Sequence, residues 1–423
     1  MDRRAKMHSL WLLLSLCAAA STSIYMHRVL GPWEYYKNVS HGTMKAALGD
    51  LYSPWMGTRA VLLEHRNPYG PEVTREIQMA FYGHPIVQNY DDPAKVVDEQ
   101  RFVYPVYVVL LLAPIAHVEF ATLHAWAPLV LGIFIVANVL LYRAIVRWPS
   151  SRMATTALIV FILASPQIVQ GLRLRQLGLL AACLLAAGVW CIFRGHWISA
   201  GVVLAVSTIK PQMVVLPLVW VLFWVLADWR RRWRLAAGFV VTLLALIAAG
   251  EWILPGWLGY FVRGLAAYRH YGPSTSILEI GFGHGIGRTL CVVLVSWLLI
   301  WAWSKRKVDA GAQEFAVPLG ALLVGTSIGF PLLPIFNQVL LILPVLIVLR
   351  EWSGLSQFFR GALVICVSWP WIAAAGLLAF PPPESTPTLL PLLPSSLVLV
   401  VPFLLLVLLA TRTPSLVEKV VSQ

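Results

Sequence analysis

The sequence predicts an all-α polytopic membrane protein, and both its composition and its apolar runs support this fold class. Of the 423 residues, 59% are hydrophobic, only 12% are charged and 19 are Trp, which excludes an ordinary soluble domain. Runs of about 17 to 25 apolar residues, long enough to cross a bilayer, recur along the chain. From these runs we predict about twelve spans, at 9–29, 122–142, 153–169, 177–194, 197–209, 211–227, 235–253, 286–304, 314–329, 331–349, 361–380 and 389–411.

The first apolar run follows a basic start, MDRRAK, as it would in a signal peptide. It is about as long as a bilayer requires, however, and further spans follow it, so we interpret 9–29 as a retained span. The five cysteines have no metal-ligand spacing. Because they lie within apolar runs, we expect packing residues rather than disulfides or a metal site. They are Cys17, Cys183, Cys191, Cys291 and Cys366.

The formal charge of +13 comes largely from short basic clusters beside the apolar runs, among them 3–6, 230–234 and 305–307. This is the pattern of the positive-inside rule, so we predict a membrane protein without a nucleic-acid partner. The apolar segment 102–116 is short and contains two prolines. When it is counted as a re-entrant or juxtamembrane helix, the clusters all fall on one side, which we take as cytoplasmic. Residues 30–121 and 254–285 are then extracytoplasmic loops of a single domain, 1–423.

The first of these loops contains the stretch ALGDLYSPWMGTRAVLLEHRNPYG, with an acid, Asp50, near its start. Ser53-Pro54 predicts a helix start and Asn67-Pro68 a stop, so we expect a helix over 54–65 that lies at the membrane interface. Asp50 then precedes a helix N-terminus, which favours an ionised carboxylate. Such a carboxylate is either a general base for a hydroxyl or a solvated acid that helps to cap the helix.

Positive side chains on the same predicted side are candidate ligands for phosphate. Lys210, in STIKPQ, ends a span and either snorkels to the headgroups or pairs with an anion such as a lipid phosphate. Arg173 and Arg175, on the turn at 170–176, would complete a cationic pocket, and their presence there breaks the usual charge bias. Gln176 either bonds sugar hydroxyls or is a polar residue at a helix end.

The second loop, 254–285, adds polar side chains to this side, and its glycines indicate mobility. Its GFGHGIG sequence follows no predicted strand, so we reject a nucleotide-binding motif. Glu251 lies just before the loop, where an acid is either functional or bonded to a helix end. The loop candidates are Arg263, Arg269, His270, Tyr271, Glu279 and His284.

Three further features are weaker signals. Arg59 and Arg101 are secondary phosphate candidates, since surface arginines usually face water. Asp91 and Asp92 are adjacent acids on an expected solvated turn, which leaves a divalent ion open without predicting one. We predict no cofactor.

The motifs occur in an order that resembles glycosyltransferase family 87, a family of integral-membrane, mannosyltransferase-like enzymes of the GT-C class. GDLYSPWMGTRAVLLEHRNPY follows the first span, and RFVYPVYVVLLLAPIA, RLRQLGLL and TIKPQ come after it. The resemblance spans roughly residues 40–230, and the rest of the chain is similar only as a run of spans. Two departures are Arg175-Gln176-Leu177-Gly178, where the family tends to have Gly-Gln-x-Asn, and Pro54-Trp55, where it has an aromatic pair.

The resemblance implies a GT-C-type bundle, a polyprenyl-phosphate-linked sugar as donor, and transfer at the outer face of the membrane. Asp50 matches the family's proposed catalytic base, Asn67-Pro68-Tyr69 its Asn-Pro-Tyr, and Tyr104-Pro105-Val106 its Tyr-Pro-Pro without the last proline. For the donor phosphate we predict Lys210, Arg173, Arg175, Arg263 and Arg269. For the sugar or acceptor we predict Tyr52, Trp55, Asn67, Tyr69, Tyr104, Gln176, Glu251 and His270.

The leading hypothesis is therefore an inverting glycosyltransferase that moves a hexose, most simply mannose, to a lipid or glycan hydroxyl. One conspicuous acid suits a single displacement better than glycoside hydrolysis, which normally uses two. We expect the bacterial inner membrane, with an extracytoplasmic active site. The alternatives are a transporter or flippase of lipid-linked saccharides, which would carry charges along its spans, and an oligosaccharide ligase or polymerase.

Overall fold

The computed structural model describes residues 3–40, 47–87, 97–271, 276–311, 313–329, 335–381 and 400–410. Within these ranges the chain forms helices and turns and no strand, which confirms the all-α class. The first part of the chain contains α1 Arg3–Tyr25, the π-helix η1 Met26–Leu30, α2 Gly31–Ser40, α3 Tyr52–Leu62, α4 Pro71–Tyr82, α5 Val108–Leu112, the 3-10 helix η3 Ala113–Ile115 and α6 Phe120–Val146.

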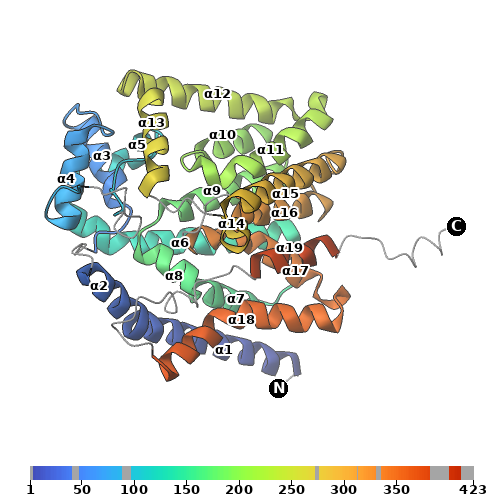
Figure 1. Cartoon of the computed structure of the whole chain (residues 1–423). Coiled ribbons are helices and arrows are strands. Elements are labelled where there is room, and N and C mark those ends of the chain that lie inside the picture. The colour runs from blue at the N-terminus through green and yellow to red at the C-terminus, as the bar shows by residue number, and fades with distance from the viewer. Residues whose placement is uncertain are drawn as a thin grey trace.

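The helices that follow form most of the bundle. They are α7 Arg152–Leu163, α8 Pro166–Arg173, α9 Leu177–Phe193, α10 Trp197–Ser207, α11 Pro211–Ala227, α12 Trp229–Ile253, α13 Trp257–Tyr271, α14 Ile277–Phe282, α15 His284–Ser304, α16 Gln313–Gly329, the 3-10 helices η4 Ile335–Leu341 and η5 Trp352–Gly354, α17 Ile342–Arg350, α18 Gln357–Ala379 and α19 Val400–Ala410. In Figure 1, α12 lies along one edge of the bundle, and α1 and α18 lie along the opposite edge.

Among the described residues, five helices are long and apolar enough to cross a membrane, which makes this an integral membrane protein. They are Ser9–Tyr36, Phe120–Val146, Trp229–Ile253, His284–Ser304 and Gln357–Ala379, and all five coincide with predicted spans. A sixth candidate is the pair α7 and α8, bent by 61°. The count of twelve stays a prediction, because the other apolar helices are shorter than a bilayer crossing.

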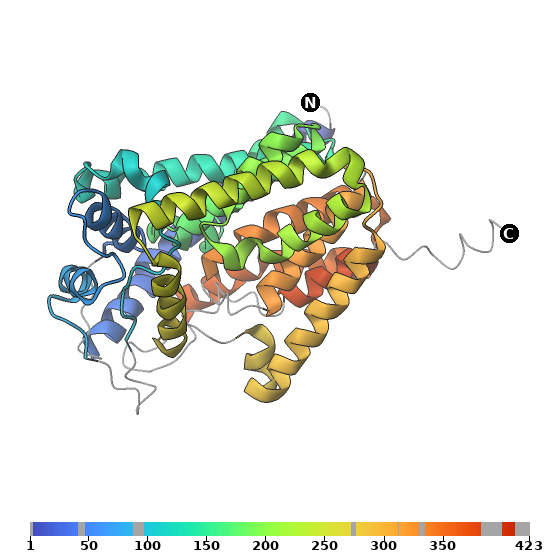
Figure 2. The same ribbon diagram turned by 90° about the horizontal axis from the view of Figure 1, so that it is seen from above.

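The shorter apolar helices form the centre of the bundle. Trp220 and Trp224 of α11 are almost fully buried, and both rings contact Phe315 of α16. Leu185 of α9 and Leu204 of α10 are also fully buried. Protein surrounds these helices, whereas the long helix α12 lies nearest the viewer in Figure 2 and α15 lies at the edge of the bundle. Both expose apolar side chains, such as Val241 and Val292. This arrangement suits a bundle whose outer helices face lipid.

Two predicted helices differ from the observed ones, one because of tertiary packing and one because of local sequence. The predicted helix 54–65 is α3, but Leu51 is its N-cap, and the Ser53 hydroxyl bonds the Gln100 carbonyl at 3.3 Å instead of capping. Trp55 and Val61 are buried rather than interfacial, because α3 packs against α5. The predicted span 153–169 breaks between α7 and α8, where Ser165 caps α8 and Pro166 starts it.

Segment 102–116 forms α5 and η3, neither of which is long enough to span a bilayer. This agrees with the decision not to count it as a crossing, although its depth in the membrane stays a prediction. The predicted span 331–349 also changes character, since η4 precedes the short helix α17. This 3-10 segment contacts α8, α9 and α16, so it lies inside the bundle rather than at its lipid-facing surface.

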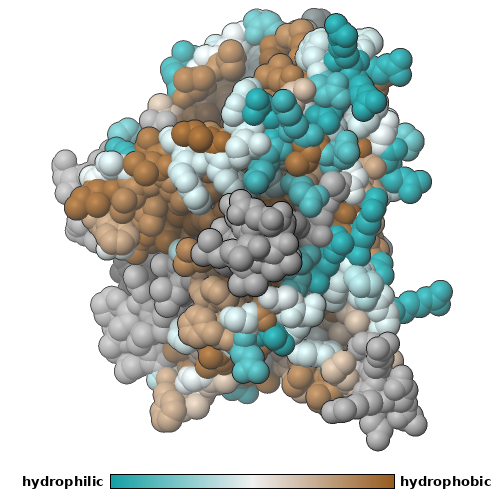
Figure 3. Space-filling view, turned by 90° about the vertical axis from the view of Figure 1, so that its right-hand side faces the viewer, coloured by the Kyte–Doolittle hydropathy of each residue, from teal (hydrophilic) through white to brown (hydrophobic). Residues whose placement is uncertain are grey.

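The predicted basic clusters gather at one end of the bundle. Arg232, at the start of α12, bonds the carbonyl of Val308, which follows the 305–307 cluster. Arg350 bonds the carbonyl of Val146, and Arg147 lies over the ring of Phe193, next to Arg194. Figure 3 views the molecule from this end and shows hydrophilic residues gathered along one side of it. The stretch around Asp50 lies at the other end, beside α3 and α4 (Figure 1).

Candidate active site at Asp50

The turn between α8 and α9 holds the backbone of Asp50 in place. The Asp50 N–H donates to the Leu174 carbonyl at 2.6 Å. Gly49 has φ +77°, and a Cβ there would lie 2.8 Å from the Leu174 oxygen, so both its conformation and the space around it require glycine. Asp50 is therefore tied to a residue more than a hundred positions later in the chain, two residues before Gln176.

A histidine and an arginine fix the same segment from the other side. His124, on α6, bonds the Ala47 carbonyl through Nε2 at 2.9 Å. Arg175 donates to the His124 carbonyl at 3.3 Å and to His124 Nδ1 at 3.2 Å. A neutral imidazole with its proton on Nε2 satisfies both ring contacts. The predicted phosphate ligand Arg175 thus positions the segment that carries Asp50, and it has φ +52° in doing so.

Gln176 links the Asp50 carboxylate to a buried lysine. Its Nε2 donates to the Asp50 carboxylate, and its Oε1 accepts a hydrogen bond of 2.8 Å from Lys210 Nζ. Gln176 is the N-cap of α9 and Lys210 the N-cap of α11, so two helix starts meet here. The positive ends of both helix dipoles point toward the site, which favours negative charge within it.

Lys210 is only 7% exposed, although its side chain carries a charge. Its Nζ lies 5.1 Å from the centre of the Phe336 ring, which comes from η4. Burial lowers the pKa of Lys210 to about 8, and the nearby charge of Asp50 opposes that shift. An ammonium in this setting is ready to bind a second anion, because its direct partner, Gln176, is neutral.

Tyrosines line the site on the side of the first loop. Burial raises the pKa of Tyr104, and the charge of Asp50 raises it further, so its hydroxyl is near that carboxylate and stays protonated. Tyr69 donates to the Tyr104 carbonyl at 2.5 Å, and its own N–H donates to Asn67 Oδ1 at 3.0 Å. Asn67 and Tyr69 therefore support Tyr104 from behind.

Tyr268, on α13, extends this wall, although no sequence motif pointed to it. Burial raises its pKa, and the charges of Asp98 and Asp50 raise it further. In addition, the Tyr107 hydroxyl bonds the carbonyl and the hydroxyl of Thr208 at 3.0 and 2.9 Å. The sequence segments RFVYPVY and TIKPQ, which were singled out separately, therefore contact each other directly.

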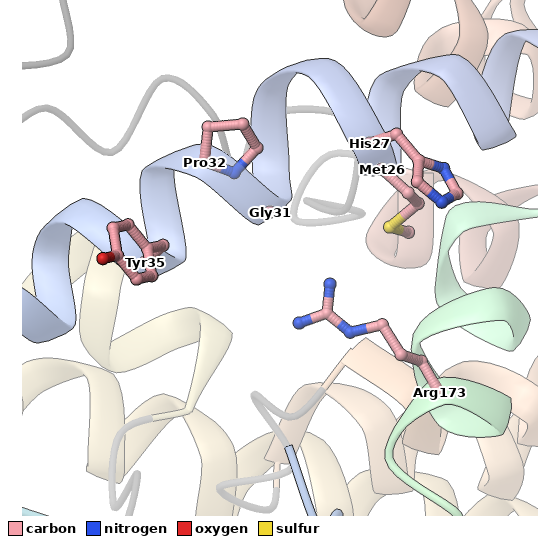
Figure 4. Close-up of a pocket in the computed structure, with 6 residues that line it drawn as sticks. All are labelled: Met26, His27, Gly31, Pro32, Tyr35 and Arg173. Atoms are coloured by element: carbon pink, nitrogen blue, oxygen red, sulfur yellow. The ribbon is translucent and has the colours of Figure 1, made fainter. Parts of the chain in front are cut away.

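Arg173 lies apart from the Asp50 and Lys210 side chains. It forms an ion pair with Glu34 of α2 and lines a groove of about 570 Å³ together with Met26, His27, Gly31, Pro32 and Tyr35. Figure 4 shows its guanidinium pointing from α8 toward the first helix at the π-helical turn. The structure thus directs Arg173 to a different partner from Lys210.

Several predicted residues have structural partners away from this site. Tyr52 and Trp55 pack with Phe120, and Arg59 donates to the Ala116 carbonyl at 2.7 Å. Glu251 is exposed and accepts from the Gly256 N–H at 2.7 Å. The remaining candidates are Arg101, paired with Glu99; Arg263, over the Tyr260 ring; His270, exposed on α13; and Glu279, paired with His284 and Arg288.

The backbones of Arg269 and Tyr271 lie on α13, but their side chains are outside the described part of the structure. Asp91 and Asp92 also lie outside the described residues. Among the residues that are described, no group of three or more His, Cys, Asp or Glu side chains could hold a metal ion.

The sequence analysis missed Phe336 and Asn337 because they fall within the apolar run 331–349. The adjacent pair Asn337-Gln338 was the available signal, since polar side chains inside a membrane segment are costly and usually have a role. Asn337 is 3% exposed, and its Oδ1 lies 3.4 Å from the position of a Cβ at Gly178.

Comparison with known proteins connects this site to a family. The sequence profile of glycosyltransferase family 87 matches residues 102–324, more than half of the chain. The match includes Tyr104, Gln176 and Lys210 but not Asp50, which reaches this site through the contacts with Leu174 and Gln176. No curated protein and no solved structure matches the chain. The chain therefore belongs to glycosyltransferase family 87, a membership that indicates a membrane-bound glycosyltransferase.

Proposed function

We propose that this protein transfers a hexose, with inversion, from a polyprenyl-phosphate donor to a hydroxyl of a lipid or polysaccharide at the outer face of the membrane. The observation that carries the proposal is the Gln176 side chain, which bonds Asp50 through its nitrogen and Lys210 through its oxygen. A carboxylate and a buried ammonium are thereby held one amide apart, a spacing suited to a base and a phosphate ligand on either side of a reacting carbon.

A phosphate-linked sugar already carries a leaving group, so the enzyme has to deprotonate the acceptor, bind the phosphate and align the two. Asp50 takes the proton of the acceptor hydroxyl while that oxygen attacks the anomeric carbon. The bond from this carbon to the phosphate oxygen breaks, and its electron pair leaves with the polyprenyl phosphate. One displacement inverts the configuration and needs one carboxylate rather than two.

Lys210 is assigned to the leaving phosphate. A buried ammonium destabilises the fold unless an anion offsets it, and the phosphate of a membrane-embedded donor is such an anion. Its contact with the Phe336 ring keeps water from one side of the ammonium and so strengthens its attraction to that phosphate. Arg175 supports the chemistry indirectly, because its bonds to His124 hold the Asp50 segment.

Three parts of the proposal come from the family resemblance and from the distribution of charge. The polyprenyl-phosphate donor and mannose are what the resemblance implies. Transfer at the extracytoplasmic face, in a bacterial inner membrane, follows from the position of Asp50 at the end of the bundle opposite the basic clusters. The apolar segment 102–116, which contains Tyr104, could contact a lipid acceptor or the lipid tail of the donor.

The test compares the wild type with Asp50→Asn, each in nanodiscs with radiolabelled polyprenyl-phosphate mannose and a membrane lipid extract. The substitution keeps the size of the side chain and removes the base, so we expect transfer to fall by about 100- to 10,000-fold. Glu251→Gln is the matched control, since this acid is exposed and accepts a hydrogen bond from the Gly256 N–H, and it should transfer at the wild-type rate.

Equal activity of Asp50→Asn and the wild type, with both folded, would remove Asp50 as the base. A product of retained anomeric configuration would exclude the single displacement even if Asp50 proved essential. A wild type that transfers no sugar from this donor to any component of the extract would exclude the donor assignment.

A further inference from the structure

We propose that Asn337, with Gln167, recognises a hydroxyl of the transferred sugar, and that Asn337 supplies from η4 an amide that the α9 start lacks at Gly178. This inference rests on the proposed glycosyl transfer and names the specificity residues of that same site. It begins with η4, a 3-10 segment that the sequence suggested only as part of a span.

The first step is the position of Asn337. A Cβ at Gly178 would lie 3.0 Å from Lys210 Nζ and 3.4 Å from Asn337 Oδ1, so both polar atoms border the same point at the start of α9. Phe336, the preceding residue, lies under the Lys210 ammonium. The amide of Asn337 is therefore beside the cation assigned to the donor phosphate.

The second step is that this amide has unused bonding capacity. Asn337 is 3% exposed, and its Oδ1 has no hydrogen-bond partner among the described residues. Buried polar atoms in folded proteins nearly always have partners, so an unpartnered amide oxygen beside the cation assigned to the donor phosphate is a candidate for a contact with the ligand. A side-chain oxygen accepts hydrogen bonds and repels phosphate oxygens, so the group that it receives is a donor such as a hydroxyl.

Gln167, on α8, offers a complementary hydrogen-bond donor. Gln167 is 5% exposed, and its Nε2 also has no hydrogen-bond partner within the described ranges. It lies one helical turn before Gly171, whose Cβ position is 3.0 Å from the Phe336 Cβ, so Gln167 is on the face of α8 that meets η4. An amide oxygen and an amide N–H on facing elements match a hydroxyl, which both donates and accepts.

Gln176, the predicted sugar ligand, has no such free amide atoms. Its amide oxygen and its amide nitrogen already bond Lys210 and Asp50, so it is committed to holding the charged groups. Position 178, where the resemblance would place an asparagine, is glycine, and a Cβ there would lie only 3.0 Å from Lys210 Nζ and 3.2 Å from Met213 Sδ. Recognition of the sugar thus passes from α9 to η4.

The experiment measures kcat/KM for transfer from polyprenyl-phosphate mannose and from its four monodeoxy analogues, with the wild type, Asn337→Ala and Asn138→Ala in nanodiscs. Asn138 is the matched control: it is a fully buried amide whose side-chain atoms also have no hydrogen-bond partner in the described structure. It lies on α6, fourteen residues after His124 and therefore about 21 Å along that helix from the site.

We expect Asn337→Ala to lower kcat/KM for the full donor by roughly 10- to 100-fold, as expected for the loss of a buried hydrogen bond to substrate. In the wild type, kcat/KM should be lower by a similar factor for one of the deoxy donors. With that donor, Asn337→Ala should lower kcat/KM no further. Asn138→Ala should behave as the wild type does.

The inference would be overturned if Asn337→Ala lowered kcat/KM equally with all five donors, or if it had wild-type kinetics. It would also be overturned if Asn138→Ala lowered kcat/KM to the same extent. The proposed function fails separately: Asp50→Asn that keeps transfer removes the base but leaves the deoxy pattern standing. A wild type that neither binds nor uses any of these donors overturns both.

Discussion

The arginines at the basic end of the bundle and Lys210 at the other end differ in the partners of their positive charges. At the basic end, guanidinium groups donate to backbone carbonyls: Arg232 to Trp224 at 2.5 Å, Arg350 to Val146 at 2.5 Å and Arg360 to Leu355 at 2.8 Å. At the other end, the ammonium of Lys210 donates to a side-chain amide that is itself bonded to a carboxylate. The residue types are similar, but their partners differ.

That difference separates stability from function. Carbonyls near helix ends lack partners within the helix, so an arginine that bonds them satisfies groups that folding would otherwise leave unpaired. A buried lysine beside a neutral amide instead makes folding less favourable, since burial lowers its pKa. Substitution at the basic end should therefore lower stability, and substitution at the Asp50 end should lower activity.

The largest expected effect in this comparison is that of Lys210→Met. Methionine has a similar shape and no charge, so we expect kcat/KM for transfer to fall by about 100- to 1,000-fold through loss of a charged contact to phosphate. The thermal unfolding midpoint in detergent should stay close to that of the wild type, because removal of the burial cost offsets the unpaired Gln176 oxygen. A variant that loses stability but keeps its activity per folded molecule would reverse the contrast.

The next effect tests how rigidly the Asp50 segment must be held. Gly49→Ala places a Cβ 2.8 Å from the Leu174 oxygen at a positive φ, so it should displace Asp50 and lower transfer by about 100-fold. Gly83→Ala is the matched control, because Gly83 has φ +75° and nothing within 4 Å of its Cβ position. This control should lose about 1 kcal/mol of stability and no activity; similar activity losses in the two variants would show that backbone strain alone is responsible.

The fold class could be predicted from the sequence. So could two of the three linked site residues, Asp50 as a candidate base and Lys210 as a candidate phosphate ligand. Asp50 and Lys210 were visible because a charged residue is conspicuous in a chain with so few. Gln176 was noted as a sugar ligand, but its bridging role depends on a contact between residues 50, 176 and 210, which no local pattern encodes. The resemblance to family 87 made Asp50 a stronger candidate for the catalytic base, and the profile match confirms the family.

Other features could not be predicted, for physical reasons. Apolar content does not distinguish a spanning helix from a 3-10 segment buried in protein, so η4 and its Asn337 were read as span. Ser53-Pro54 has the sequence of a helix start, yet packing of α3 on α5 moved the start to Tyr52. Arg173 was expected beside Lys210, but Glu34 of α2, a partner distant in sequence, pairs with it instead.

A smaller effect follows from the pKa of Lys210, which burial lowers to about 8 from its ordinary 10.5. Transfer needs the ammonium, so kcat/KM should fall about tenfold per pH unit above pH 8. Below pH 8 the lysine is protonated in both the folded and the unfolded chain. Between pH 8 and 10.5 only the unfolded chain keeps this proton. The free energy of unfolding should therefore rise with pH across this window, by up to about 3 kcal/mol. Lys210→Arg stays charged, so it should abolish this rise in stability with pH. If the rise persisted in that variant, it would come from another titrating group.

The smallest expected effect on activity belongs to the basic end, and it is the one that completes the contrast. The Arg232 guanidinium stacks 3.7 Å from the Trp224 ring centre and donates to the carbonyls of Trp224 and Val308. Arg232→Met should therefore lower the free energy of unfolding by about 1 to 3 kcal/mol, because the buried Trp224 carbonyl loses this donor, whereas the Val308 carbonyl still accepts from Trp224 Nε1 at 2.8 Å; transfer per folded molecule should stay at the wild-type value. The control is Arg231→Met, whose side chain is 83% exposed and whose ion pair with Asp228 is 4.0 Å long, so it should change neither quantity. If Arg232→Met lowered transfer at unchanged stability, the basic end would itself take part in the reaction cycle, and the assignment of separate roles to the two ends would have to be given up.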